Sequence, residues 1–175
     1  MHLDGLEQMG AHFDLRHGVL QAAAPDGLTG TDIFLEFPSV GATENLLFAA
    51  VLAKGKTVIG NAAREPELAD LAQMLNAMGA KVEGAGTSTI EVHGVSALSP
   101  ADHVAVADRL VAGTYALAAA ATGGSIEVQG CNPDFLRMEL RKMEGAGCTV
   151  DRTEDSFTVT GPDRPQPQDI ATLPY

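Results

Sequence analysis

The feature that most constrains the fold of this chain is an internal repeat with a period of about 70 residues. Residues 33–94 and 103–161 can be written under each other as two full copies. The matched residues are Thr43 with Thr114, Ala49-Ala50 with Ala120-Ala121, Gly60 with Gly130, Gly79 with Gly147, and Gly94 with Gly161. A truncated third copy opens the chain, where LEQMGAHFDL lies over LNAMGAKVEG. Units of this kind bury their apolar faces against their neighbours.

Each full copy is predicted to form strand, helix, strand, helix, strand, strand. In the first copy, strands at 33–37 and 57–59 flank a helix over 42–53. Pro66 between two glutamates predicts the start of the second helix, and Gly79 predicts its end. The alternating segments AKVEG and TIEVHG predict a closing hairpin with one buried face.

The second copy repeats the pattern. HVAVA is the expected first strand, Asn132 the expected N-cap of the second helix, Pro133 its first residue and Gly147 its end. The predicted fold class is therefore α/β, with mixed α+β character, built from βαβαββ repeats. The stretch around Pro100 is the natural linker between the copies.

Composition limits the partners. A net charge of −12 with only 11 basic residues argues against nucleic acid and anionic membranes, both of which attract clustered Lys and Arg. An anionic small substrate then needs a few well-placed cations, and Arg64 and Arg109 are candidates. The N-terminus lacks a signal-peptide pattern, and no apolar stretch approaches the roughly 20 residues of a membrane span. We therefore expect a cytoplasmic protein with reduced cysteines.

Five segments resemble a known family. PSVGATEN, NAAREPE, LNAMGAKVEGAGT, ADRLVAGTYALAAAATGG and NPDFLRMELRKMEGAG are similar, in order, to UDP-N-acetylglucosamine 1-carboxyvinyltransferases, enolpyruvyl transferases of the EPSP synthase family. The resemblance implies two domains, each of three βαβαββ units around a pseudo-threefold axis, an inside-out α/β barrel or alpha-beta prism. It also implies an incomplete fold. Residues 1–105 resemble the C-terminal part of the first domain, and residues 106–175 the first repeat of the second domain plus the start of the next.

The resemblance implies an activity. Members transfer the enolpyruvyl group of phosphoenolpyruvate to the 3-hydroxyl of UDP-N-acetylglucosamine in peptidoglycan precursor synthesis, by addition and then elimination of phosphate. No metal or organic cofactor is implied. The family's Lys-Asn motif, its loop with a catalytic Cys or Asp, its general base and its C-terminal Arg have no counterpart here. Cys131 and Cys148 do not match that loop. We therefore expect a central fragment that is inactive alone and needs the remainder of the two-domain enzyme as its partner.

Two turns carry the candidate site residues. Ser39, Val40 and Gly41 resemble the family segment that contacts the UDP moiety, and free N–H groups at a helix start suit an anion. The alternative is that Ser39 only caps the helix. Asp108 and Arg109 resemble a pair that lines the interdomain cleft, where they are the candidate catalytic residues. The alternative is an Asp beside a helix start with a solvated Arg.

Arg64 and Glu65 are the remaining candidates, as a substrate-binding pair that resembles cleft-lining residues just before a helix. Their alternative is a first-turn carboxylate with a local ion pair. The five histidines show no spacing typical of a metal site, and His12 and His93 are expected to face solvent.

Two other functions stay open. The chain can be a non-catalytic module that binds a nucleotide sugar or complements another chain, or a relative of 3-phosphoshikimate 1-carboxyvinyltransferase. The segments SVGATEN and NAAREPE favour the UDP-sugar enzyme.

Overall fold

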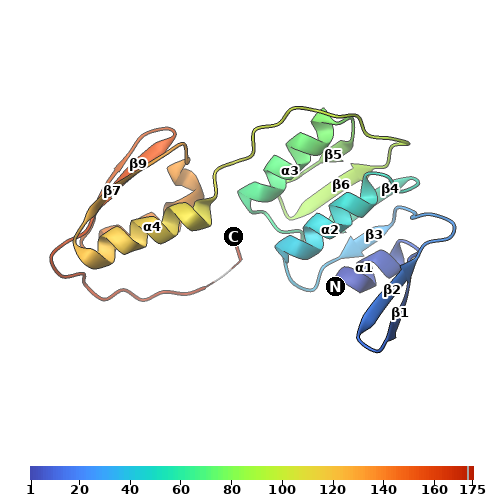
Figure 1. Cartoon of the computed structure of the whole chain (residues 1–175), viewed down its shortest axis with the longest axis horizontal. Coiled ribbons are helices and arrows are strands. Elements are labelled where there is room, and N and C mark those ends of the chain that lie inside the picture. The colour runs from blue at the N-terminus through green and yellow to red at the C-terminus, as the bar shows by residue number, and fades with distance from the viewer. Residues whose placement is uncertain (173) are drawn as a thin grey trace. The chain divides into compact units, whose positions relative to one another are not determined.

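The computed structural model describes residues 1–172 and 174–175. The chain forms two compact units (Figure 1). Unit 1 runs from Met1 to Val104 and includes Pro174 and Tyr175, and unit 2 begins at Ala105. Each unit has a hydrophobic core of its own. The assignment of residues 1–105 and 106–175 to the two domains of an enolpyruvyl transferase remains a prediction.

Unit 1 contains the first full repeat and the truncated copy before it. Its elements are α1 (His2–Gln8), β1 (His12–Arg16), β2 (Val19–Ala23), β3 (Asp32–Phe34), α2 (Val40–Ala50), β4 (Lys56–Gly60), α3 (Pro66–Ala77), β5 (Lys81–Glu83) and β6 (Thr89–His93). The main sheet has the strand order β3-β4-β6-β5, with β3 parallel to β4 and the other pairs antiparallel. Helices α2 and α3 lie on one face of this sheet, and β1 and β2 form a separate hairpin (Figure 1).

Unit 2 contains the second repeat. Its elements are α4 (Arg109–Thr122), β7 (Ser125–Gln129), a 3₁₀ turn (Pro133–Leu136), α5 (Arg137–Gly145), β8 (Thr149–Arg152) and β9 (Ser156–Thr160). Its sheet has the order β7-β9-β8, and both strand pairs are antiparallel. The second helix therefore starts where Asn132 and Pro133 predict, but its first turn is 3₁₀. The Asn132 side chain accepts a hydrogen bond from Asp134 N at 2.9 Å, as an N-cap does.

The predicted first strand of the second repeat, HVAVA, is wrong. Residues 101–107 have no regular secondary structure. His103 is held by unit 1, because its Nε2 lies 2.9 Å from Asp70 Oδ1 on α3. Val104, the last residue of unit 1 before the division, is 92% exposed. This segment therefore connects the two units and does not form a strand beside β7.

Two helix starts correct the register of the repeat. Thr43 N donates to Ser39 O at 3.0 Å, and Ala112 N donates to Asp108 O at 3.0 Å, so both N-caps close the same first helical turn. Thr43 therefore corresponds to Ala112 and not to Thr114. The predicted helix over 42–53 likewise starts earlier, at Val40, because Ser39 is its cap.

After the first helix of each copy, one of the predicted glycine pairs is wrong and another is correct. Asn61 directly follows β4 with a φ of 53°, and Gly130 directly follows β7 with a φ of 72°. The counterpart of Gly130 is therefore Asn61 and not Gly60. Gly94 and Gly161 do correspond. Gly94 N donates to Gly55 O at 2.9 Å, and Gly161 N donates to Gly124 O at 2.8 Å.

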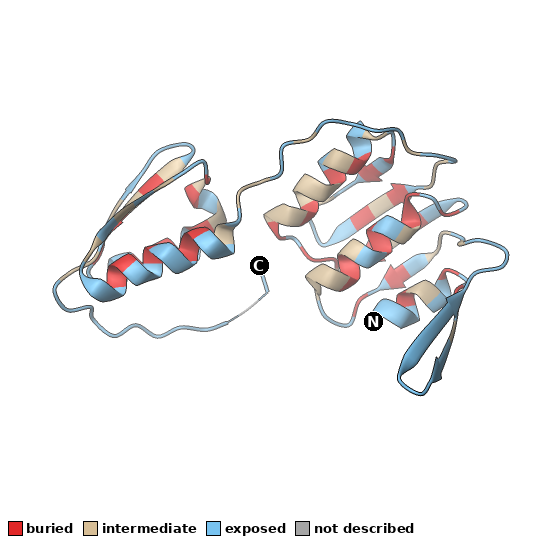
Figure 2. Cartoon of the chain, in the orientation of Figure 1, coloured by how far each residue is buried: buried red, intermediate tan, exposed pale blue. Residues whose placement is uncertain are grey.

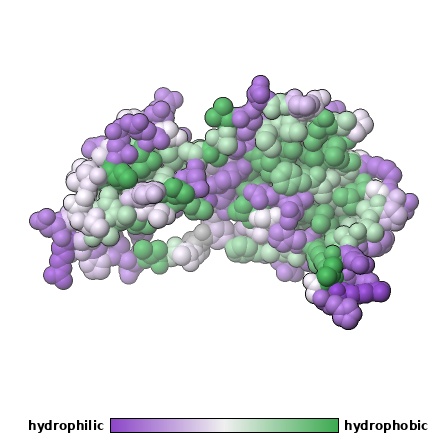
Figure 3. Space-filling model, viewed as in Figure 1, coloured by the Kyte–Doolittle hydropathy of each residue, from purple (hydrophilic) through white to green (hydrophobic). Residues whose placement is uncertain are grey.

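Buried residues form a stripe along each long helix (Figure 2). The Ala-rich segment of α4 is a packing face as predicted, since Ala116, Ala119 and Ala120 are buried. Large apolar side chains are also exposed on the helices and on β3, and Figure 3 shows hydrophobic residues on the visible surface of unit 1. They include Phe34 on β3, Phe48 on α2 and Leu52 just after α2 in unit 1, and Leu110, Val111, Tyr115 and Leu117 on α4. Apolar surface is therefore exposed on both units.

Candidate functional site

The first turn of α2 holds Ser39, Val40 and Gly41, and all three are half-buried. Ser39 has an extended backbone, and its Oγ accepts a hydrogen bond from Ala42 N at 3.3 Å. Ser39 is therefore a helix cap, as the alternative interpretation held, and capping leaves other N–H groups of the turn pointing outward. The first turn of α2 carries no acidic residue, so its positive dipole end is not neutralised.

Gly41 is not required by the fold of this turn. Its φ is not positive, and an added Cβ would meet only the ring of His2, at 3.4 Å. A glycine that neither backbone conformation nor packing demands is compatible with close approach of a ligand to the backbone.

A second segment, residues 61–65, is fixed to the same turn. Asn61 Nδ2 donates to Leu35 O at 2.8 Å, and Ala63 N donates to Thr43 Oγ1 at 3.1 Å. The Thr43 hydroxyl in turn donates to Ser39 O at 2.8 Å. The segment therefore lies beside the start of α2, where the parallel strands β3 and β4 end. Ligands bind at this edge in many open α/β sheets.

Arg64 and Glu65 stand on this segment with different environments. Arg64 is exposed, and its Nη2 donates to the backbone oxygen of Tyr175 at 2.9 Å. Glu65 is 7% exposed, and its Oε2 has no hydrogen-bond partner among residues 1–172 and 174–175. A buried carboxylate oxygen is costly unless a donor reaches it, so Glu65 offers an acceptor for a ligand or another part of a larger protein.

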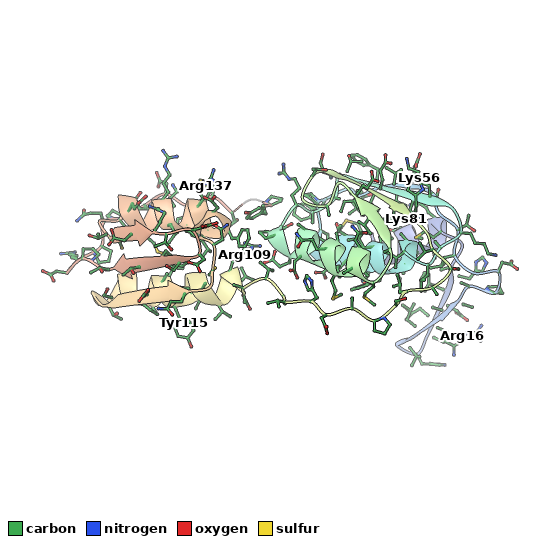
Figure 4. The ribbon with its side chains drawn as sticks, turned by 90° about the horizontal axis from the view of Figure 1, so that it is seen from above. Arg16, Lys56, Lys81, Arg109, Tyr115 and Arg137 are labelled. Carbon is green, nitrogen blue, oxygen red and sulfur yellow. The ribbon has the colours of Figure 1, made fainter. Side chains whose placement is uncertain are left out.

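Asp108 and Arg109 begin α4 in unit 2. Asp108 Oδ1 accepts hydrogen bonds from Leu110 N at 2.9 Å and Val111 N at 3.0 Å, so the carboxylate caps the helix. Arg109, labelled in Figure 4, follows it as the first residue of α4. Its side chain is half-buried. The structure thus places Asp108 at a helix start, as the alternative interpretation held, and shows that it caps the helix. Its catalytic role remains a prediction.

An open pocket of about 620 Å³ lies beside this turn within unit 2. Its lining residues are Ala105, Val106, Ala107, Gly130, Asn132, Phe135, Glu154 and Asp155. Two carboxylates on the lining oppose an anion, so this pocket by itself does not suit phosphoenolpyruvate.

The two cysteines are free thiols in the core of unit 2. Burial, and to a lesser extent the charge of Asp108, raises the pKa of the Cys131 thiol. Burial raises the pKa of the Cys148 thiol. A reactive cysteine needs the opposite, an accessible thiol with a lowered pKa. Neither cysteine is therefore suited to be a nucleophile.

Among residues 1–172 and 174–175, no group of three or more His, Cys, Asp and Glu side chains could hold a metal ion. Within the same described part of the chain, no helix has the length and apolar character needed to cross a membrane. His12 and His93 are exposed, as predicted.

Two features of unit 1 were missed by sequence reasoning. Pairing Thr43 with Thr114 makes Thr43 a residue common to both copies, which hides its bond to Ala63 N. The pairing of His103 with Asp70 joins residues too distant in sequence for any local pattern to reveal. For Thr43 the sequence does contain a signal, which is the unequal spacing after β4 and β7. Glu65 follows Asn61 by four positions, whereas Asn132 follows Gly130 by two.

The model of the EPSP synthase (3-phosphoshikimate 1-carboxyvinyltransferase) family matches residues 1–175. The UDP-N-acetylglucosamine 1-carboxyvinyltransferases of Mycolicibacterium paratuberculosis and Corynebacterium jeikeium are each 53% identical to the chain over 175 residues. That of Mycobacterium tuberculosis is 52% identical over 175 residues. Each match covers 100% of this chain but 42% of the relative, so the chain spans less than half the length of these relatives.

Solved structures show the same fold. The enolpyruvyl transferase NikO from Streptomyces tendae has a TM-score of 0.80 at 23% identity, over 93% of this chain and 42% of that one. An EPSP synthase from Acinetobacter baumannii has a TM-score of 0.64 at 21% identity, over 91% of this chain and 38% of that one. The predicted α/β fold and the resemblance to UDP-N-acetylglucosamine 1-carboxyvinyltransferases are both confirmed. Because the family model matches every residue of the sequence, the chain belongs to the EPSP synthase family.

Proposed function

We propose that the chain is the central part of an enolpyruvyl transferase that moves the enolpyruvyl group of phosphoenolpyruvate to the 3-hydroxyl of UDP-N-acetylglucosamine. In this proposal the start of α2 binds the UDP moiety through Ser39, Val40 and Gly41. Arg64 and Glu65 bind another part of the substrate, and Asp108 and Arg109 line the reacting cleft. The reaction belongs to peptidoglycan precursor synthesis and takes place in the cytoplasm, where it serves cell shape and division.

Three observations at one turn support the nucleotide-binding part. The start of α2 has an unneutralised dipole end, a glycine that the fold does not need, and a neighbouring segment tied to it by hydrogen bonds. The names of the curated relatives supply the substrate: enzymes 53% identical to this chain are called UDP-N-acetylglucosamine 1-carboxyvinyltransferases.

The nucleotide site is tested by Ser39→Asp. Asp is as good an N-cap as Ser, and Asp108 caps the equivalent turn of unit 2, so the variant should keep its thermal stability. The new carboxylate would face the diphosphate, and we expect the affinity for UDP to fall by about tenfold or more. Isothermal titration calorimetry with UDP measures this on the 175-residue chain.

The matched control is the reverse exchange, Asp108→Ser, which should leave UDP binding as in the wild type. Equal affinity of the wild type and Ser39→Asp would exclude the start of α2 from the nucleotide site. A rise in UDP affinity in Asp108→Ser as large as the fall in Ser39→Asp would show only a general effect of net charge, because the control removes the kind of charge that the test variant adds.

The alternative of a non-catalytic nucleotide-sugar-binding or complementing chain is separated by turnover. The residues that the family uses for proton transfer have no match in this sequence, so we expect no release of phosphate from phosphoenolpyruvate and UDP-N-acetylglucosamine by the 175-residue chain. Steady phosphate release would contradict this. Phosphate release with 3-phosphoshikimate in place of the UDP-sugar would favour the sister enzyme.

A further inference from the structure

The two repeats act as an internal control, because a feature that both copies share serves the fold. The shared features include the N-caps Ser39 and Asp108, the positive φ of Asn61 and Gly130, and the close packing of Gly94 and Gly161. A feature that only one copy has needs another explanation.

The first copy carries an insertion of two residues that the second lacks. From Asn61, the residue with positive φ, the chain reaches the N-cap of α3 at Glu65. From Gly130, the matching residue, it reaches the matching N-cap two residues sooner, at Asn132. Ala62 and Cys131 each directly follow the residue with positive φ, and both are buried. We therefore count Ala63 and Arg64, which stand between Ala62 and the N-cap Glu65, as the added pair.

Thr43 holds this insertion in place. Its hydroxyl is fully buried, accepts the hydrogen bond of Ala63 N at 3.1 Å and donates to Ser39 O at 2.8 Å. The corresponding residue of the second copy is Ala112, which has no hydroxyl and faces no insertion. The helix starts equally well there, since Ala112 N makes the same 3.0 Å bond to its N-cap.

We infer that Thr43 is a positioning residue of the proposed substrate site. Its hydroxyl joins the Ser39–Gly41 turn to the inserted Ala63–Arg64 pair, so that the exposed Arg64 guanidinium and the buried, unpaired Glu65 oxygen stand at fixed places beside the nucleotide turn. The inference rests on the proposed function, because it treats the turn at Ser39 as the binding site for UDP.

The test replaces Thr43 by Val, which keeps the shape and branching of the side chain and exchanges only the hydroxyl for a methyl group. Ala63 N is then buried without an acceptor, and the insertion loosens. We expect faster hydrogen exchange at Ala63 and Arg64, and a loss of about tenfold in UDP affinity of the folded protein. Thr43→Ser should restore both to within about twofold of the wild type, because it returns the hydroxyl.

The matched control is Thr57→Val. Thr57 is equally buried in unit 1, and its hydroxyl has no hydrogen-bond partner in the described part of the chain, so UDP affinity should not change. In an Arg64→Ala background, Thr43→Val should lose less affinity than in the wild type, since both changes act on one contact.

The outcomes separate the two ideas. If the wild type binds UDP and Thr43→Val binds it equally well, the positioning role is wrong and the nucleotide site stands. Full additivity of Thr43→Val and Arg64→Ala would also overturn the positioning role. If the wild type does not bind UDP, the proposed nucleotide site is wrong, and the positioning role falls with it.

Discussion

Replacing Gly94 by Ala should destabilise unit 1 by about 3 kcal/mol or more, because a methyl group at this position has no space. The added Cβ would overlap the carbonyl oxygen of Ala53 and lie 3.3 Å from Ala50 O. Both are backbone atoms, so no side-chain rotation relieves the clash. Gly94 N also donates to Gly55 O at 2.9 Å, which ties the end of β6 to the residue directly before β4. Thermal unfolding and urea titration of the 175-residue chain measure the loss.

Gly41→Ala is the matched control for stability. Its Cβ would meet only the ring of His2 at 3.4 Å, and alanine is the better helix former, so unit 1 should be as stable as in the wild type or slightly more stable. A Gly94→Ala protein with an unchanged urea midpoint would show that the end of β6 does not pack under α2 as described.

Phe157→Ala should unfold unit 2 and leave unit 1 folded. Half of the buried core residues of unit 2 are Ala or Cys, among them Ala112, Ala116 and Cys131. Phe157 is 1% exposed and is the one aromatic residue of this core among the residues that the structure describes. Removing a buried Phe costs about 3–5 kcal/mol. A unit of this size is stabilised by only about 5 kcal/mol in total, so most of its stability would be lost.

Two-dimensional amide NMR of the chain distinguishes the units. We expect the signals of β7, β8 and β9 to collapse to unfolded positions in Phe157→Ala, while those of β4 and β6 keep theirs because unit 1 has a separate core. Phe157→Leu, which keeps most of the apolar volume, should retain both sets. Loss of all signals together in Phe157→Ala would mean that the two cores unfold as one.

Local sequence signals predicted what depends on local chemistry. Pro66, Asn132 and the glycines after each second helix mark element ends, because proline, capping side chains and positive φ act over one turn of chain. The closing hairpins followed from alternation. The expected strand at HVAVA is wrong because an alternating pattern shows only that a segment can pair with a strand, not that it does. Here the His103 side chain instead contacts Asp70 on α3.

The register of the repeat shows the same limit. Identical letters suggested pairing Thr43 with Thr114 and Gly60 with Gly130, but hydrogen bonds and backbone angles pair Thr43 with Ala112 and Asn61 with Gly130. Asn is among the few residues other than Gly that adopt positive φ readily, so residue identity and backbone conformation need not agree.

By itself the sequence determined the repeat, the order of most elements, the two candidate turns and the family resemblance, because these rest on periodicity and short-range preferences. Only the tertiary structure decided which contacts the candidate residues make. It made Ser39 and Asp108 caps, buried Glu65 without a partner, and brought Ala63 to the hydroxyl of Thr43. Contacts between residues about 20 positions apart depend on how strands and helices pack, and no local pattern contains that information.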